Sequence, residues 1–75
     1  MQIITEPVYE GCNGRNVELV QMAVGGIEID GHAGPGTKKR MTAAQAALGF
    51  PKGLQCGIAS ELTIRALGFL ADLTD

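Results

Sequence analysis

The 75-residue chain is poor in aromatic residues, histidine and cysteine, and these shortages restrict what it can be. It has no tryptophan, and its aromatic residues are Tyr9, Phe50 and Phe69, so its core must be built from smaller aliphatic side chains. One histidine and two cysteines, with no Cys-x-x-Cys pair, do not supply the four ligands of a structural zinc site. We therefore expect no metal and no other cofactor.

The chain also has no large excess of positive or negative charge. Six lysines and arginines stand against eight aspartates and glutamates, which gives a formal net charge of −2. This near balance argues against a module that mainly binds nucleic-acid phosphates or an anionic membrane surface. Apolar runs stay far below the roughly 20 residues that span a bilayer, and the first residues do not resemble an export signal. We therefore expect neither nucleic-acid nor membrane partners.

Glycine, in contrast, is abundant, with 11 residues in 75, or about twice its average usage. Many glycines indicate many tight turns. A chain of this length forms one small domain and is too short to build a deep active-site cleft around itself as well. We therefore expect a protein that is not an enzyme.

Turn and cap signals predict a mainly α fold, a compact three-helix module with a short extended N-terminal segment and glycine-rich turns. Residues 1–10 are expected to be extended, because β-branched residues and a proline disfavour a helix there. Residues 11–75 are expected to form the helical domain. The expected helices are Val17–Val24 with Asn16 as N-cap, Pro35–Leu48, and a third helix that follows Ser60 as N-cap and breaks near Gly68.

Helical spacing predicts which side chains face the core. The expected buried side chains are Met41, Ala44 and Leu48 in the second helix, and Leu62, Ala66, Phe69 and Leu73 (or Leu70) in the third.

One pattern of small residues occurs twice, 26 residues apart. The two copies are Gly31-x-Ala33-Gly34-x-x-Thr37-x-x-x-Met41 and Gly57-x-Ala59-Ser60-x-x-Thr63-x-x-x-Leu67. Each copy combines a glycine turn with the start of a helix. The second and third helices are therefore expected to enter the core in the same way.

Longer patterns carry a resemblance to a family. They are Gly11-x-x-Gly14-x-x-Val17-x-x-Val20-Gln21, Asp30-Gly31-x-x-Gly34-Pro35-x-Thr37-x-x-x-Met41-x-x-Ala44-Gln45, and Gly53-Leu54-x-x-Gly57-x-x-x-x-Thr63. Together they resemble the peptidoglycan-binding domain family, the three-helix modules attached to many bacterial and phage cell-wall hydrolases. The resemblance covers residues 11–67 and implies a non-catalytic wall-binding module. The chain departs from the family at Ala33 and Ala44, where phenylalanine is usual, and at Cys56, where a second aspartate is usual.

The candidate ligand-binding residues are Asp30, His32, Lys38, Lys39 and Gln45. Asp30 is also suited to binding amides of its own turn. His32 follows that turn, and either contacts a sugar or peptide or is an ordinary solvated loop residue. Gln45 either binds a ligand amide or caps neighbouring carbonyls.

The basic run at residues 38–40 lies in the first turns of the second helix, where the helix dipole disfavours cations. Lys38 and Lys39 therefore either form an anion site, for example for the carboxylates of wall stem peptides, or lie on a solvated helix face. Cys12 and Cys56 are compatible with one disulfide, and free thiols are the alternative.

The expected function is non-catalytic binding of peptidoglycan by a protein that is associated with a phage. The alternative is a small structural or interaction protein, such as a capsid-decoration or tail accessory subunit of a virion. The partner is accordingly either peptidoglycan or the protein subunits of a larger assembly. We expect a virion or cell-wall-facing location if the protein derives from a phage, and a cytoplasmic location otherwise.

Overall fold

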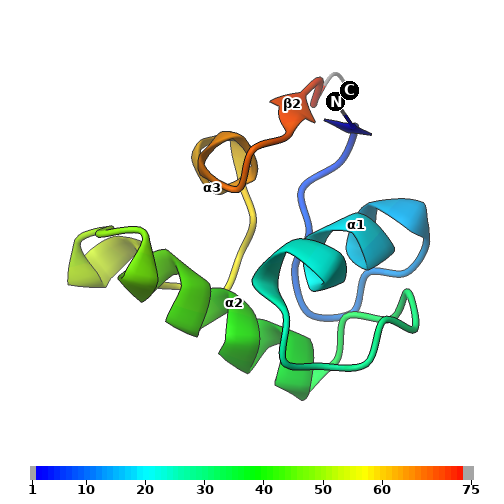
Figure 1. Cartoon of the computed structure of the whole chain (residues 1–75), viewed down its shortest axis with the longest axis horizontal. Helices are drawn as coiled ribbons and strands as arrows, with labels where there is room; N and C mark the ends of the chain where they lie inside the picture. Colours follow the sequence, from blue (N-terminus) through cyan, green and yellow to red (C-terminus); the bar gives the residue numbers. More distant parts are fainter. Residues whose placement is uncertain (1, 74–75) are drawn as a thin grey trace.

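The computed structural model describes residues 2–73 and contains three helices, in agreement with the mainly α prediction. The fold measures 26 × 23 × 21 Å along its principal axes. Helix α1 packs against α2 (Figure 1). In chain order the elements are β1 (Ile3–Ile4), α1 (Arg15–Val24), α2 (Pro35–Ala47), the 3-10 turn η1 (Lys52–Leu54), α3 (Glu61–Ala66) and β2 (Leu70–Ala71).

The first helix begins earlier than predicted, at Arg15 rather than Val17, and its N-cap is Gly14 rather than Asn16. Gly14 has a φ of 114°, a conformation that favours glycine. The side chain of Asn16 is engaged elsewhere: its Oδ1 accepts from Thr5 N and its Nδ2 donates to Thr5 Oγ1, both at 3.2 Å. Asn16 therefore fastens the N-terminal segment to α1 instead of capping the helix.

The buried face of α2 differs from the prediction. Met41 is buried as expected, but Leu48 is 42% exposed and Ala44 is only partly buried. Two polar residues, Thr37 and Gln45, take the remaining buried positions. Hydrophobic spacing alone missed this face because two of its three buried residues are polar: Thr37 bonds to Gln21 of α1, and Gln45 bonds to Thr63 of α3.

The prediction of which side of α3 faces the core is wrong. Leu62 is 57% exposed and Ala66 is exposed, whereas Thr63 and Ile64 are buried. The helix ends at Ala66, with Gly68 at a φ of 96° beyond it, so the break expected near Gly68 is present. Thr63 faces the core because its hydroxyl accepts a buried hydrogen bond from Gln45 Nε2.

The extended N-terminal residues are part of the core. Ile3 and Ile4 of β1 pair in parallel with Leu70 and Ala71 of β2, so the segment after α3 is a strand rather than more helix. Val8 forms an antiparallel bridge with Ala59. The buried apolar side chains are Ile4, Val8, Val17, Leu19, Val20, Ala33, Met41, Ala59 and Ile64.

Candidate functional site

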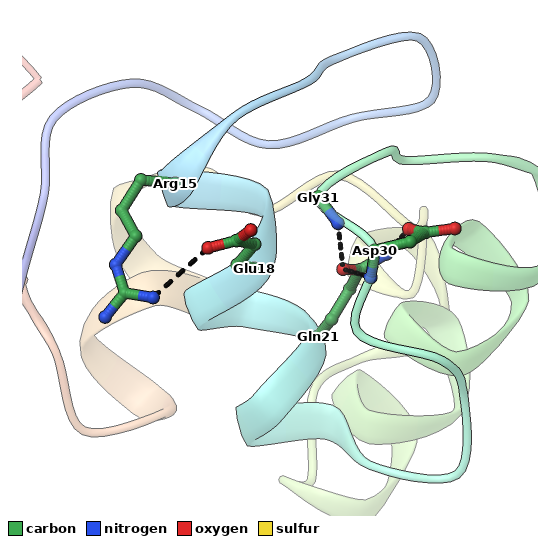
Figure 2. A network of polar contacts seen from close by, with 5 residues as sticks. All are labelled: Arg15, Glu18, Gln21, Asp30 and Gly31. Carbon is green, nitrogen blue, oxygen red and sulfur yellow. Dashed lines mark hydrogen bonds and ion pairs between the residues drawn. The ribbon is translucent and has the colours of Figure 1, made fainter.

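The turn that follows α1 is built around the side chain of Gln21, which is 99% buried (1% exposed). Gln21 extends from α1 toward the loop that carries Asp30 and Gly31, one turn along the helix from the Arg15–Glu18 ion pair (Figure 2). Its Oε1 accepts from Asp30 N at 3.1 Å and from Gly31 N at 3.0 Å. The amide is therefore bonded to the turn on its acceptor side.

The donor side of Gln21 is also fully used. Its Nε2 donates to Asp30 Oδ1 at 3.0 Å, to His32 O at 3.1 Å and to Thr37 Oγ1 at 3.1 Å. Two hydrogens serve these three acceptors, so one hydrogen is shared. The interior polar groups of this turn are therefore satisfied by one side chain.

Gln45 of α2 makes equivalent hydrogen bonds to the turn that precedes α3. Its Oε1 accepts from Gly57 N at 2.9 Å, and its Nε2 donates to Ile58 O and to Thr63 Oγ1, each at 3.0 Å. Gln45 is 1% exposed. It is therefore removed from the candidate ligand-binding residues, because its amide is buried and committed to the fold.

The two networks are equivalent in space as well as in sequence. Gly31 packs on α1, where an added Cβ would lie 3.2 Å from Glu18 Cγ. Gly57 packs on α2 in the same way, with Thr42 Oγ1 2.9 Å from the added Cβ. Glu18 and Gln21 each precede their α2 counterparts, Thr42 and Gln45, by 24 residues. The repeated sequence pattern is therefore a repeated three-dimensional unit of a helix, a glycine turn and the start of the next helix.

Asp30 is exposed, and its carboxylate is held by the turn. His32 N donates to Asp30 Oδ1 at 2.9 Å, and Gln21 Nε2 donates to the same oxygen. These two bonds, in that order of importance, hold the pKa of Asp30 below its ordinary value, since they favour the charged form. The carboxylate thus serves the turn, as the sequence predicted.

His32 is exposed, and its ring is oriented by a neighbouring loop. Its Nδ1 contacts Asn13 Oδ1, while Asn13 Nδ2 donates to Gly11 O at 3.3 Å. Because the amide of Asn13 donates through its nitrogen to Gly11, its oxygen accepts from His32, which places the ring proton on Nδ1. Nε2 of His32 has no hydrogen-bond partner within residues 2–73, and in the neutral ring it can accept a hydrogen bond from a ligand.

Asp30 and His32 meet at a shallow cavity of about 260 Å³. This first cavity is lined by Gln21, Ile27, Glu28, Asp30, His32, Gly34, Gly36 and Thr37. Lys38 and Lys39 line a different one, of about 450 Å³. This second cavity is lined by Glu10, Pro35, Lys38, Lys39, Thr42, Ala43, Ala46 and Gln55. The predicted ligand-binding residues therefore belong to two surface cavities and, for Gln45, to the interior.

The basic run at residues 38–40 is also divided. Arg40 turns back to α1, where its Nε donates to Gly25 O at 3.0 Å and its guanidinium covers Gly26. It therefore satisfies a carbonyl at the C-terminal end of α1. Lys38 and Lys39 are the cations of the run that line the second cavity.

Both cysteines are free. Cys12 Sγ lies 3.8 Å from Pro7 O, and Cys56 Sγ lies 3.9 Å from Ile58 O. The predicted alternatives were one disulfide or two thiols, and the structure contains the thiols. Each sulfur is directed to a backbone carbonyl of its own loop.

Residues 2–73 hold no group of three or more His, Cys, Asp or Glu side chains that fits a metal ion. Within the same range no helix is both long and apolar enough to cross a bilayer. Comparison with protein-family models, curated proteins and solved structures gives no match. The function has therefore to be inferred from the geometry of these residues and the spacing of the motifs.

Proposed function

We propose that the protein is a non-catalytic module that binds peptidoglycan, and that its helices form the three-helix arrangement of the peptidoglycan-binding domain family. One observation carries the proposal: the motif positions that resemble the family are the ones that build the two turn networks. They are Gln21, Asp30, Gly31 and Thr37 in the first network, and Gln45, Gly57 and Thr63 in the second. A motif whose members are bonded to one another in the interior supports kinship more strongly than spacing alone.

The surface chemistry is consistent with a wall ligand. Peptidoglycan offers sugar hydroxyls and amides, which suit the free Nε2 of His32 and the carboxylate of Glu28 in the first cavity. It also offers peptide carboxylates, which suit Lys38 and Lys39 in the second. Both cavities are shallow, as expected of a module that binds a polymer on its surface.

The test is retention of the purified protein on insoluble peptidoglycan sacculi, with chitin and cellulose as matched polysaccharides that lack stem peptides. We expect saturable retention on sacculi and little on the other two. A His32→Ala variant should bind more weakly with an unchanged melting curve. Equal retention on all three matrices, or no retention on sacculi of either lysine or diaminopimelate type, contradicts the proposal.

A second candidate is a structural or interaction subunit of a larger assembly, and one observation favours it. Ile58 and Leu62 are 44% and 57% exposed, at the repeat positions equivalent to His32 and Gly36 of the first cavity. The second repeat therefore presents aliphatic side chains where the first presents a polar cavity. Stoichiometric co-purification in a particle, abolished by Ile58→Asp, together with no retention on sacculi, would favour this function.

A further inference from the structure

The second cavity is formed by one face of α2, the loop that carries Glu10 and the residue that follows η1, Gln55. Its volume of about 450 Å³ is within the usual range of small-ligand sites. Thr42 Oγ1 donates to Lys38 O, one turn earlier in α2, at 3.0 Å. The cavity therefore lies along a regular helix.

The charges of the second cavity are of both signs, and they form no ion pair within residues 2–73. Lys38 and Lys39 supply two cations, and Glu10 supplies one carboxylate. The ion pairs among residues 2–73 are Arg15–Glu18 and Arg65–Glu61, so none of these three groups is neutralised within that range. A ligand that carries both an anionic and a cationic group would be complementary to such a cavity.

The stem of Lys38 is held in place. An added Cβ on Gly57 would lie 2.6 Å from Lys38 Cγ, which means that the lysine stem covers the glycine. A lysine whose methylene chain already packs loses less conformational freedom when its ammonium binds an anion. Gly57 thereby connects the second turn network to the second cavity.

The uncharged lining can contact both a small side chain and a peptide backbone. Pro35, Ala43 and Ala46 present small apolar groups to the cavity, which suit contact with a methyl group. Gln55 Nε2 donates to Phe50 O at 2.9 Å, which leaves its Oε1 to accept a hydrogen bond from a ligand N–H. An alanine-sized residue with an amide N–H fits this lining.

We propose that the second cavity binds a short peptide of alanine-sized residues, with its free carboxylate at Lys38 and Lys39 and an ammonium group at Glu10. This inference rests on the proposed function, since the stem peptides of peptidoglycan combine alanine, free carboxylates and amino groups. It goes further in that it assigns the peptide, rather than the sugar chain, to this cavity.

The probe is the soluble peptide Nα-acetyl-L-Lys-D-Ala-D-Ala, titrated into ¹⁵N-labelled protein and followed by amide chemical shifts. We expect millimolar binding, with the largest shifts at residues 35–46 and at Gln55. Amidation of the peptide carboxylate should weaken binding by about tenfold or more, and acetylation of the lysine amine by about threefold.

Matched variants locate the site. Lys39→Glu and Ala46→Leu, which change the charge and the volume of the cavity, should each weaken peptide binding by about tenfold. Lys52→Glu and Ala47→Leu make the same changes outside the second cavity and should bind as the wild type does. All four positions are exposed, so the fold should persist, and the dispersion of the amide spectrum checks it.

Three outcomes of the peptide titration overturn the inference. Shifts centred on the first cavity, equal binding by all four variants, or binding of inorganic phosphate but not of the peptide would exclude a peptide site here.

Retention on sacculi separates this inference from the proposed function. If sacculi retain the wild type and the Lys39→Glu variant equally, wall binding stands and the peptide site is wrong. If sacculi retain neither while the soluble peptide binds in the cavity, wall binding fails and the peptide site stands.

Discussion

Gln21 Nε2 donates to Thr37 Oγ1 across 3.1 Å, and this buried bond joins the end of α1 to the third residue of α2. Gln45 and Thr63 repeat the bond at 3.0 Å, from the end of α2 to the third residue of α3. Successive helices are thus fastened by the same pair of residue types. In a core without aromatic residues at its centre, these polar pairs specify the packing that large side chains specify elsewhere.

Removal of either glutamine amide should be strongly destabilising. Gln21→Met keeps the side-chain length but leaves the N–H of Gly31 and the hydroxyl of Thr37 without their partner, at a cost of about 3 kcal/mol in the free energy of unfolding. Gln45→Met loses three bonds rather than five and should cost about 2 kcal/mol. Urea unfolding at equilibrium measures both, with Gln2→Met as the exposed control. Losses as small as that of the control would show that the networks do not stabilise the fold.

A carboxylate at position 56 should stabilise the second network. Cys56 occupies the position equivalent to Asp30, but its sulfur does not provide the oxygen that accepts from the turn and from the glutamine. Cys56→Asp should therefore bond to Ile58 N and Gln45 Nε2 and raise the free energy of unfolding by about 0.5–1.5 kcal/mol. Cys56→Ala is the control, and an aspartate variant no more stable than the alanine variant would contradict the equivalence of the two turns.

The sequence predicted the start of α2 and the break after α3 because glycine and proline act locally. Pro35 starts α2 as predicted, and Gly68 follows the end of α3. The helix faces were predicted less well. Leu62 was expected inside and Thr63 was not, because helical spacing counts apolar residues and the interior here is partly polar.

The candidate site was predicted only in part for a similar reason. Asp30 and His32 do share a cavity, as their proximity in sequence suggests. Gln45 was predicted either to bind a ligand amide or to cap neighbouring carbonyls, and it is buried with its Nε2 donating to Ile58 O. The repeated glutamine at the end of α1 and α2 was the signal for its true role. Glu10 was not predicted at all, since only the fold brings it to the cavity with Lys38.

Gly57 should tolerate alanine less well than Gly49 does. Both have a positive φ, 75° and 84°, so each alanine variant has the cost of the left-handed conformation, about 1 kcal/mol. Only at Gly57 would the new Cβ also lie 3.1 Å from a backbone oxygen, that of Lys38. We expect Gly57→Ala to lower the free energy of unfolding by about 2–3 kcal/mol and to displace the lysine stem. Equal losses for the two variants would show that α2 and the second turn do not pack closely.

The thiols of Cys12 and Cys56 should contribute differently to the stability of the fold. Because Cys12 and Cys56 are free, the melting temperature should be the same with and without reductant. Cys12 packs against the core and Cys56 is exposed, so Cys12→Ala should cost about 1 kcal/mol and Cys56→Ala almost nothing. Thermal melts of the two variants measure this difference. A lower melting temperature in reductant would indicate a bridge between the two sulfurs.

Asp30 should make stability depend on pH in the acid range. The fold lowers the pKa of Asp30 from its ordinary 3.8, through the bonds from His32 N and Gln21, so its charged form is favoured in the folded state. The resulting stabilisation is complete above the pKa of the unfolded chain and is lost as the pH falls through the lower pKa of the folded state. Asp30→Asn keeps an oxygen for both donors but carries no charge. The wild type should therefore be more stable than this variant near neutral pH, and the difference should shrink as the pH falls below 3.8 and through the lower pKa of the folded state. Urea unfolding of both proteins across the acid range checks this, and a difference that stays constant with pH would show that the charge of Asp30 does not stabilise the turn.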